Sequence, residues 1–272
     1  KRVDPVSGAR VFNLLERSLY PPNWIMKKLD VIIIDIQDTG VRYSTFISSI
    51  TKLFESSSDN DVPVIILDRP NPLGGQKISG PLPREEYQSF EAYHLVPIRH
   101  GMTIGELLLM VNEMGWAKDL KRVDLKIVPM ANWKRQQYMD DLRLPWKKPA
   151  PYIKDLNALI MYTGMDLLRG TNINVGFGTE LPYLKFGSPW LATKFFKEKL
   201  DMLDLPGLTF REVSYRPKGS PYFNRIPKYN GKSCSGIEIS ISDNKLVKPL
   251  ETATSIITLI SQLHPREFKW EG

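Results

Sequence analysis

The sequence predicts an α/β protein, with a Rossmann-like parallel sheet domain packed against a smaller α+β domain. Residues 31–36 (VIIIDI) and residues 62–68 (VPVIILD) are short β-branched runs without polar alternation, which is typical of buried strands. Between them, residues 41–55 place apolar side chains at helical spacing. Two buried strands joined by one helix form a βαβ unit, and such a unit requires a parallel sheet.

The elements of the first domain follow in order. Because the strand at 31–36 shows no alternation, we expect cover on both of its faces. After the second strand a Pro/Gly-rich loop covers residues 69–83, and loops of that length in compact domains are usually functional or disordered. A helix over residues 103–113 and a strand over residues 124–130 complete the sheet domain. We expect this domain to span residues 1–135. Because the sequence lacks an initiator Met and a signal-like start, we interpret the chain as a fragment or a processed form.

The pattern of predicted elements changes in the second half, residues 136–272, which we expect to form the α+β domain. A second glycine-rich, polar loop covers residues 169–183. Around it the patterns predict helices over residues 155–168, 189–203 and 249–263, and strands over residues 208–215 and 236–242.

The composition of the chain excludes several classes of function. The chain has 272 residues, with 37 Lys and Arg against 30 Asp and Glu, so its formal net charge is +7. This excess favours an anionic partner, but the basic residues are dispersed and no stretch resembles a nucleic-acid arm, so we expect no nucleic-acid partner. No apolar run is long enough to span a membrane. The single cysteine, Cys234, excludes an internal disulfide and a cysteine-based zinc site.

Polar side chains gather where the predicted strands end. In open parallel sheets, ligands bind beyond the carboxyl ends of the strands. The three groups are Asp35, Gln37, Asp38 and Arg42 after the first strand; Asp68, Arg69 and Asn71 after the second; and Met130, Asn132 and Trp133 after the third.

Each of these residues also has a structural interpretation. Asp38 could cap the next helix, and Asp35 could pair with a nearby arginine. Thr103 and Glu106 fit a capping box, in which each side chain bonds a helix-end amide of the other residue. His100 could ligate a metal, but the other histidines offer no ligand spacing, so we favour His100 as a hydrogen-bond donor to a substrate oxygen and expect neither metal nor cofactor.

Common catalytic motifs are absent from the sequence. There is no phosphate-binding GxxxxGK[ST], no GxGxxG after a strand and no GxSxG elbow. What remains is an acid-rich strand edge with arginines, amides and aromatics. Carbohydrate sites use this combination, because carboxylates and amides bind hydroxyls and a carboxyl pair cleaves a glycosidic bond.

Several stretches in a fixed order resemble one family across essentially the whole chain. They are DIQDTGVRYSTF, LDRPNPLGG, PIRHGMTIGE, GTNINVGFGTE and the closing HPREFKW. Together they resemble the NamZ-type exo-β-N-acetylmuramidases, a glycoside hydrolase family formerly described as a domain of unknown function. The resemblance implies release of N-acetylmuramic acid from the non-reducing end of peptidoglycan fragments. It also implies a Rossmann-like domain and an auxiliary domain with the active-site cleft between them, and a secreted or periplasmic location.

The chain departs from the family pattern in two respects. Members usually carry a further N-terminal strand-helix segment with a Pro-Glu-His-Gly motif, and this chain starts downstream of it. In the second glycine-rich loop, Arg169 and Phe177 stand where the family tends to have Glu and Arg.

The proposed ligand suggests a role for each candidate. Asp38 and Asp68, with Glu106 third, are the predicted catalytic carboxylates, one to protonate the leaving oxygen and one to activate water or stabilise the oxocarbenium ion. A substrate-assisted route through the acetamido group would need fewer carboxylates. Arginine would bind the lactyl carboxylate of muramic acid, with Arg42 and Arg69 as the candidates and Arg169 as a displaced substitute. The predicted substrate-binding residues are Asp35, Gln37, Arg42, Arg69, Asn71, His100, Asn132, Trp133, Thr171, Asn172 and Thr179.

Three functions compete on these observations. The first is the muramidase, and the second is a glycan-binding relative without catalysis, suggested by the departures at Arg169 and Phe177. The third is a nucleic-acid-binding protein, which rests only on the net charge. The oligomeric state is not readable from the sequence.

Overall fold

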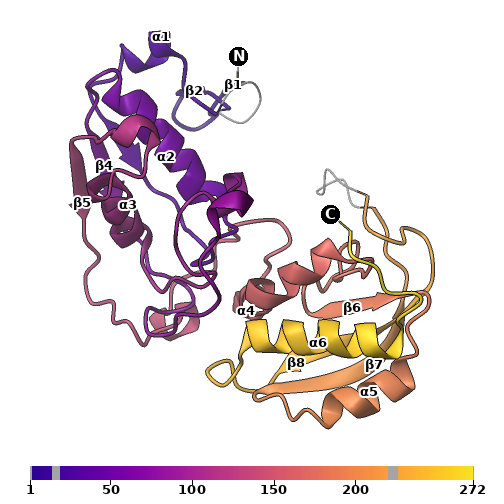
Figure 1. Ribbon diagram of the computed structural model, residues 1–272. Coiled ribbons are helices and arrows are strands. Elements are labelled where there is room, and N and C mark those ends of the chain that lie inside the picture. Colours follow the sequence, from indigo (N-terminus) through magenta and orange to yellow (C-terminus); the bar gives the residue numbers. More distant parts are fainter. Residues whose placement is uncertain (1, 14–18, 220–225, 272) are drawn as a thin grey trace. The chain divides into compact units, whose positions relative to one another are not determined.

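The structure is a computed structural model that describes residues 2–13, 19–219 and 226–271. The chain forms two compact units, Lys1–Tyr138 and Met139–Gly272, and each is described by itself (Figure 1). Within the described residues, no helix combines the length and the apolar character that crossing a membrane requires.

Unit 1 is built on a three-stranded parallel sheet of β3 (Ile32–Ile34), β4 (Val64–Leu67) and β5 (Leu125–Val128), in the order β3-β4-β5. Helix α2 (Thr45–Ser58) connects the first two strands, and α3 (Ile104–Glu113) lies between the second and the third. The predicted βαβ unit and parallel sheet are therefore confirmed.

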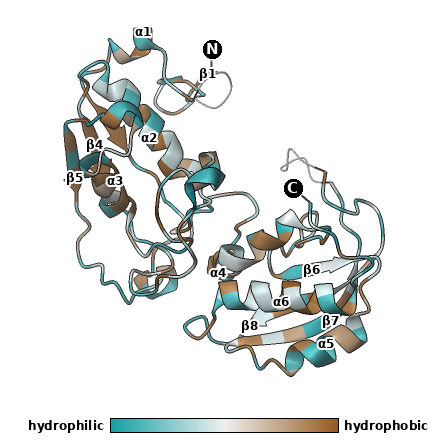
Figure 2. Ribbon diagram, in the orientation of Figure 1, coloured by the Kyte–Doolittle hydropathy of each residue, from teal (hydrophilic) through white to brown (hydrophobic). Residues whose placement is uncertain are grey.

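Both helices pack on one face of this sheet. Ile34, Val64 and Ile66 point into a core shared with Phe54 of α2 and Leu108 of α3. Figure 2 shows β4 and β5 as largely apolar. Consecutive right-handed crossovers in the order β3-β4-β5 place both helices on the same side.

The other face of the sheet is open in the part of the chain that the structure describes. Ile33 is 60% exposed, and Leu67 and Val128 are exposed on the same two-residue period. The expected cover on both faces of the first strand is thus wrong for these residues, because neither crossover helix lies on that side.

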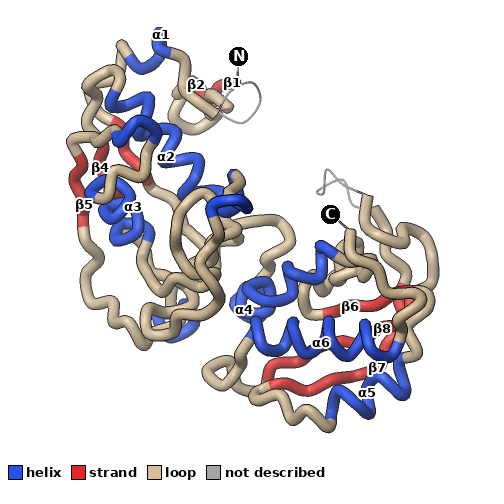
Figure 3. The backbone as a smooth tube through the Cα atoms, in the orientation of Figure 1, coloured by secondary structure: helices blue, strands red, loops and turns tan. Residues whose placement is uncertain are grey.

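Short elements complete unit 1, and long loops join them (Figure 3). They pack around the sheet without extending it, and the sequence patterns were too short to predict them. They are β1 (Arg2–Val3), β2 (Arg10–Val11), α1 (Asn23–Met26) and the 3-10 turns η1 (Glu85–Tyr87), η2 (Phe90–Ala92) and η3 (Lys118–Leu120).

Unit 2 contains a three-stranded antiparallel sheet in the order β6-β8-β7, which consists of β6 (Lys185–Ser188), β8 (Cys234–Ile241) and β7 (Leu208–Tyr215). Its helices are α4 (Leu156–Met165), α5 (Thr193–Asp201) and α6 (Pro249–Leu263), with 3-10 turns η4 (Met139–Leu142) and η5 (Asp166–Gly170). The α+β prediction is confirmed, although β6 was not predicted. Helices α4 and α6 touch at Gly164, where a Cβ atom would lie 1.9 Å from the Pro249 carbonyl oxygen.

A buried histidine links α2 to the segment before α3. The Thr51 hydroxyl donates to the Ile47 carbonyl at 2.9 Å, so its oxygen accepts from His94 Nε2 at 2.8 Å. The His94 ring stacks on Trp116 with 5.6 Å between centroids. Burial, reinforced by the nearby Lys52 ammonium, lowers the pKa of His94 to about 4.

This burial predicts a loss of stability in mild acid. The unfolded chain takes up a proton on His94 near pH 6.5, whereas the folded chain resists it until about pH 4, so stability falls as the pH drops through this window. At pH 5 the loss corresponds to about 2 kcal/mol of unfolding free energy. Urea unfolding at pH 7 and pH 5 measures it. His94→Gln cannot titrate and serves as the matched control, and an equal loss in both proteins would contradict the prediction.

Candidate functional site

The turn that follows β3 is built around Asp38 and Gly40. Gly40 adopts φ +76°, and its N–H donates to Asp38 Oδ2 at 2.9 Å. The other carboxylate oxygen, Oδ1, is buried and has no hydrogen-bond partner among the described residues. Asp38 does not cap α2, whose N-cap is Ser44, so the proposed capping role is wrong.

His100 faces the same carboxylate. Its Nδ1 accepts from the Met102 N–H at 3.2 Å, which places the proton of a neutral imidazole on Nε2. Nε2 lies 3.7 Å from Asp38 Oδ2 and bonds no other described residue. Asp38 is 4% exposed and His100 is 3% exposed. Two buried polar atoms of neighbouring side chains, His100 Nε2 and Asp38 Oδ1, thus have no hydrogen-bond partner among the described residues, which is rare in folded proteins.

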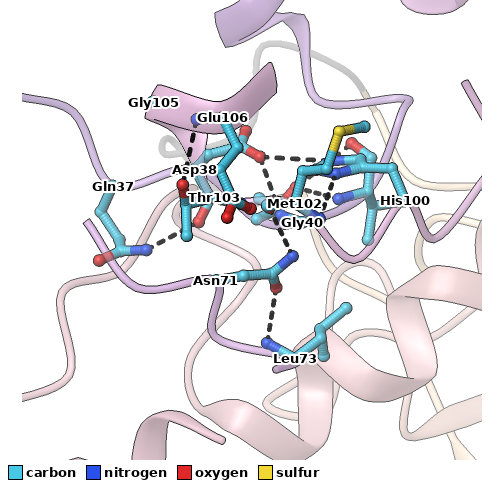
Figure 4. A network of polar contacts seen from close by, with 12 residues as sticks. Gln37, Asp38, Gly40, Asn71, Leu73, His100, Met102, Thr103, Gly105 and Glu106 are labelled. Carbon is cyan, nitrogen blue, oxygen red and sulfur yellow. Dashed lines mark hydrogen bonds and ion pairs between the residues drawn. The ribbon is translucent and has the colours of Figure 1, made fainter. Parts of the chain in front are cut away.

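Two side-chain amides, the buried Asn71 and the half-buried Gln37, hold the loops around this pair (Figure 4). Asn71 Nδ2 donates to the Met102 carbonyl at 2.8 Å, and Asn71 Oδ1 accepts from the Leu73 N–H at 2.9 Å. Gln37 Nε2 donates to the carbonyls of Asp38 at 3.0 Å and Pro70 at 2.9 Å. The loops after β3 and β4 are therefore tied together.

Asp68 holds the N-terminus of α3. Its Oδ1 accepts from the N–H of Gly105 at 2.8 Å and of Arg69 at 3.0 Å, and its Oδ2 accepts from the Thr103 hydroxyl at 2.8 Å. Carboxylates are favourable at helix N-termini, where backbone N–H groups lack partners. Asp68 therefore has a complete structural role in addition to any catalytic one.

Glu106 is equally engaged. The predicted capping box is confirmed, since the Glu106 N–H donates to Thr103 Oγ1 at 3.1 Å and Glu106 Oε2 accepts from the Thr103 N–H at 3.0 Å. Glu106 Oε1 forms an ion pair with Arg135 Nη2. Arg135 also lies over the Trp133 ring, 5.8 Å from its centroid. Trp133 Nε1 is buried without a described partner, and Asn132 is exposed with φ 63°.

The predicted arginines differ in accessibility. Arg42 Nη1 donates to the carbonyls of Pro81 at 2.7 Å and Val96 at 2.6 Å, and burial lowers the pKa of Arg42. Arg69 Nε pairs with Asp35 Oδ1 at 2.5 Å, as the structural interpretation predicted. This hydrogen bond lowers the pKa of Asp35. The Arg69 side chain is 39% exposed, and its terminal nitrogens bond no other described residue.

Sequence reasoning missed Arg99. Its guanidinium bonds the Leu73 carbonyl and the Tyr138 hydroxyl, and its backbone pairs with Ser79 and Val41. The long loop after β4 is therefore fastened to the segment that carries His100. Its position beside His100 in PIRHGMTIGE was the available signal.

The side chains of the candidates in unit 2 bond backbone carbonyls of the same unit. Thr171 Oγ1 donates to the Leu168 carbonyl at 2.7 Å, and Asn172 Nδ2 donates to the Glu267 carbonyl at 2.7 Å. Thr179 Oγ1 donates to the Gly176 carbonyl at 2.7 Å.

The two departures from the family pattern also have partners in this unit. Arg169 pairs with Asp166 at 3.1 Å, and Phe177 packs edge-on against Tyr152 and Tyr183. Among the described residues of both units, no three His, Cys, Asp or Glu side chains are arranged to hold a metal ion.

Comparison with known families accounts for both halves of the chain. The family description "Exo-beta-N-acetylmuramidase NamZ, N-terminal" matches residues 1–157, and the corresponding C-terminal description matches residues 160–272. The chain belongs to the NamZ exo-β-N-acetylmuramidase family. The resemblance identified from the motifs is thereby confirmed.

Individual relatives agree with this assignment. The peptidoglycan β-N-acetylmuramidase NamZ of Bacillus subtilis (strain 168) is 35% identical over 268 residues, which are 98% of this chain and 62% of the relative. Two crystal structures of DUF1343 family proteins from Bacteroides fragilis NCTC 9343 are also similar. The first has a TM-score of 0.88 at 29% sequence identity, and the match covers 97% of this chain and 66% of the Bacteroides chain. The second has a TM-score of 0.73 at 32% identity, and the match covers 90% of this chain and 62% of the Bacteroides chain. The chain thus spans less than two thirds of the length of these relatives.

The contacts predict that substitutions of two aspartates in unit 1 differ strongly in their cost to stability. Asp68→Ala removes three hydrogen bonds at the start of α3 and should lower the unfolding free energy by about 2 kcal/mol or more. Asp38→Asn keeps an acceptor for Gly40 and loses no described partner of Oδ1, so the unfolding free energy should change by less than about 0.5 kcal/mol. Chemical denaturation of both variants tests this contrast. A cost for Asp38→Asn equal to that of Asp68→Ala would show that Asp38 is structural.

Proposed function

We propose that this chain acts as a glycoside hydrolase that releases N-acetylmuramic acid from the non-reducing end of peptidoglycan fragments. The observation that carries this proposal is the match along 98% of the chain to a protein named peptidoglycan β-N-acetylmuramidase, together with both halves of the family description. The strand-end cluster of unit 1 supports it, because carboxylate, imidazole and amide groups gather there.

Within this proposal, Asp38 is the carboxylate that takes part in the chemistry. Asp68 and Glu106 have both oxygens engaged in holding α3, whereas Asp38 Oδ1 is free among the described residues. The His100 Nε2–H faces the same carboxylate and can donate a hydrogen bond to it or to a substrate oxygen. Buried polar atoms without partners cost stability, so their presence supports a functional role.

The chemistry that fits this cluster requires few carboxylates. Most glycosidases use two carboxyl groups, one as acid and one as base or nucleophile. In a substrate-assisted reaction the acetamido oxygen of the sugar attacks the anomeric carbon while the bond to the glycosidic oxygen breaks. The acid protonates this leaving oxygen and water then opens the cyclic intermediate, so one acid and one orienting group suffice. The cluster offers one carboxylate with a free oxygen and one N–H donor, which supports the substrate-assisted route.

Recognition of the muramyl group is assigned to Arg69. A lactyl carboxylate calls for a guanidinium with free donors, and Arg69 keeps its terminal nitrogens available at an exposed position. Arg42 is buried and already bonds two carbonyls. Thr171, Asn172 and Thr179 enter the proposal as residues that hold the glycine-rich loop of unit 2 in place, since Thr171 and Thr179 bond backbone carbonyls in or next to that loop and Asn172 bonds the Glu267 carbonyl.

Hydrolysis of a chromogenic β-N-acetylmuramide, run beside the corresponding glucosaminide, tests the function. We expect cleavage of the muramide, and Asp38→Asn should lower kcat by about 10²- to 10⁴-fold. Asp124→Asn is the matched control, because Asp124 is exposed and precedes β5 at the opposite end of the same sheet. The assay uses this chain. No cleavage of the muramide would reject the proposal, and saccharide binding without cleavage would indicate a glycan-binding relative.

Arg69→Gln provides a separate test of substrate recognition. Loss of the charge-assisted contact to the lactyl carboxylate should lower kcat/KM for the muramide by about 10- to 100-fold. The glucosaminide lacks that carboxylate, so any cleavage of it should be unaffected. An equal loss with both substrates would show that Arg69 does not recognise the lactyl group.

A further inference from the structure

We propose that Asn71 is a positioning residue that fixes both the proton position of His100 and the placement of Asp38 relative to it. The proposal rests on the function proposed above for the Asp38–His100 pair. It differs from the sequence-based expectation that Asn71 binds substrate, because the structure shows the Asn71 amide engaged with the protein itself.

The link from Asn71 to His100 runs through one peptide segment. Asn71 Nδ2 donates to the Met102 carbonyl at 2.8 Å, and the N–H of the same residue, Met102, donates to His100 Nδ1 at 3.2 Å. An amide that holds the Met102 backbone therefore holds the group that keeps Nδ1 an acceptor. The imidazole proton is then left on Nε2, the nitrogen that faces Asp38 Oδ2 at 3.7 Å.

The link from Asn71 to Asp38 is a packing contact. A Cβ atom on Gly40 would lie 2.2 Å from Asn71 Oδ1 and 2.8 Å from its Cγ, so the Asn71 amide lies directly against the Gly40 backbone. That backbone, at φ +76°, presents its N–H to Asp38 Oδ2. The shape of the turn that orients Asp38 thus depends on what occupies position 71.

Asn71 is itself held in place. Its Oδ1 accepts from the Leu73 N–H at 2.9 Å, and the residue is buried. Gln37 also connects the loops after β3 and β4, because its amide donates to the carbonyls of Asp38 and of Pro70, the residue before Asn71. Figure 4 shows the Asn71 amide bonded to Met102 on one side and Leu73 on the other. One fixed side chain from the loop after β4 therefore contacts two segments that carry the pair, one after β3 and one before α3.

Asn71→Asp is the decisive variant. It keeps the size of the side chain and the acceptor for Leu73, but it removes the donor to Met102 and sets a carboxylate against a carbonyl oxygen. We expect kcat on the muramide to fall about tenfold or more, with KM within about threefold, because the pair is misplaced while the substrate contacts persist.

The second readout does not depend on activity. Nitrogen-15 NMR of the imidazoles reports which nitrogen carries the proton, and with three histidines in the chain, a His100→Gln variant assigns the signal. The proton of His100 should reside on Nε2 in the natural chain and should be shared between both nitrogens in Asn71→Asp. Asn71→Ser, which retains an oxygen acceptor and adds no charge, should give the same shift and replaces Asn71→Asp if that variant does not fold.

The outcomes separate this inference from the proposed function. A natural chain with the His100 proton on Nδ1 overturns the inference without any variant. Unchanged tautomers in a folded Asn71 variant overturn it as well. A tautomer shift in a chain that cleaves no muramide supports the positioning role and rejects the hydrolase function.

Discussion

The anchoring of α3 on the end of β4 is the interaction on which the site of unit 1 depends. Asp68 binds the Gly105 N–H and the Thr103 hydroxyl, and a Cβ atom on Gly105 would lie 2.7 Å from the Asp68 Cγ. Only glycine permits so close an approach of helix and carboxylate. Because α3 starts at this fixed point, the segment before it, which carries His100, is brought to the end of β3.

Around this anchor the structure separates satisfied polar groups from unsatisfied ones. Asp68, Glu106 and Gln37 have protein partners, whereas buried atoms of other side chains have none among the described residues. In unit 1 these unpaired atoms belong to Asp38, Arg42, Arg99, His100 and Trp133, which lie in segments that follow β3, precede α3 or follow β5. Five unpaired buried atoms in these segments are difficult to explain by folding alone, since most buried polar atoms in proteins are paired. This concentration supports these segments as the functional part of unit 1.

The sequence predicted the fold where its signal was local and periodic. The bounds of α6 and β7 match the predicted ranges, and the capping box of α3 was readable because its two residues are three positions apart. The sequence did not predict strand β6 (KFGS), because four residues that include a glycine show no alternation of polar and apolar side chains. The strand ends also located the polar cluster correctly.

The sequence did not show which carboxylates of that cluster have protein partners and which keep an unpaired oxygen. The Asp68 partners lie 35 and 37 positions away, and the Glu106 partner Arg135 lies 29 positions away. No local pattern encodes which distant donor reaches which carboxylate. Asp38, Asp68 and Glu106, which look alike in sequence, thus differ in their hydrogen-bond partners only through tertiary contacts, and the neighbours of Asn71 likewise come from three loops.

The departures from the family pattern at Arg169 and Phe177 concern the internal packing of unit 2. Asp166 accepts from the buried Tyr183 hydroxyl at 2.8 Å and also pairs with Arg169, while Phe177 packs on the Tyr183 ring. Both residues therefore converge on one buried tyrosine and stabilise the loop from within. These contacts involve neither residue of the Asp38–His100 pair, for which the catalytic role is proposed. Any effect on function would have to come from the charge and shape that the loop presents, and there Arg169 adds a cation where the family tends to have an acid.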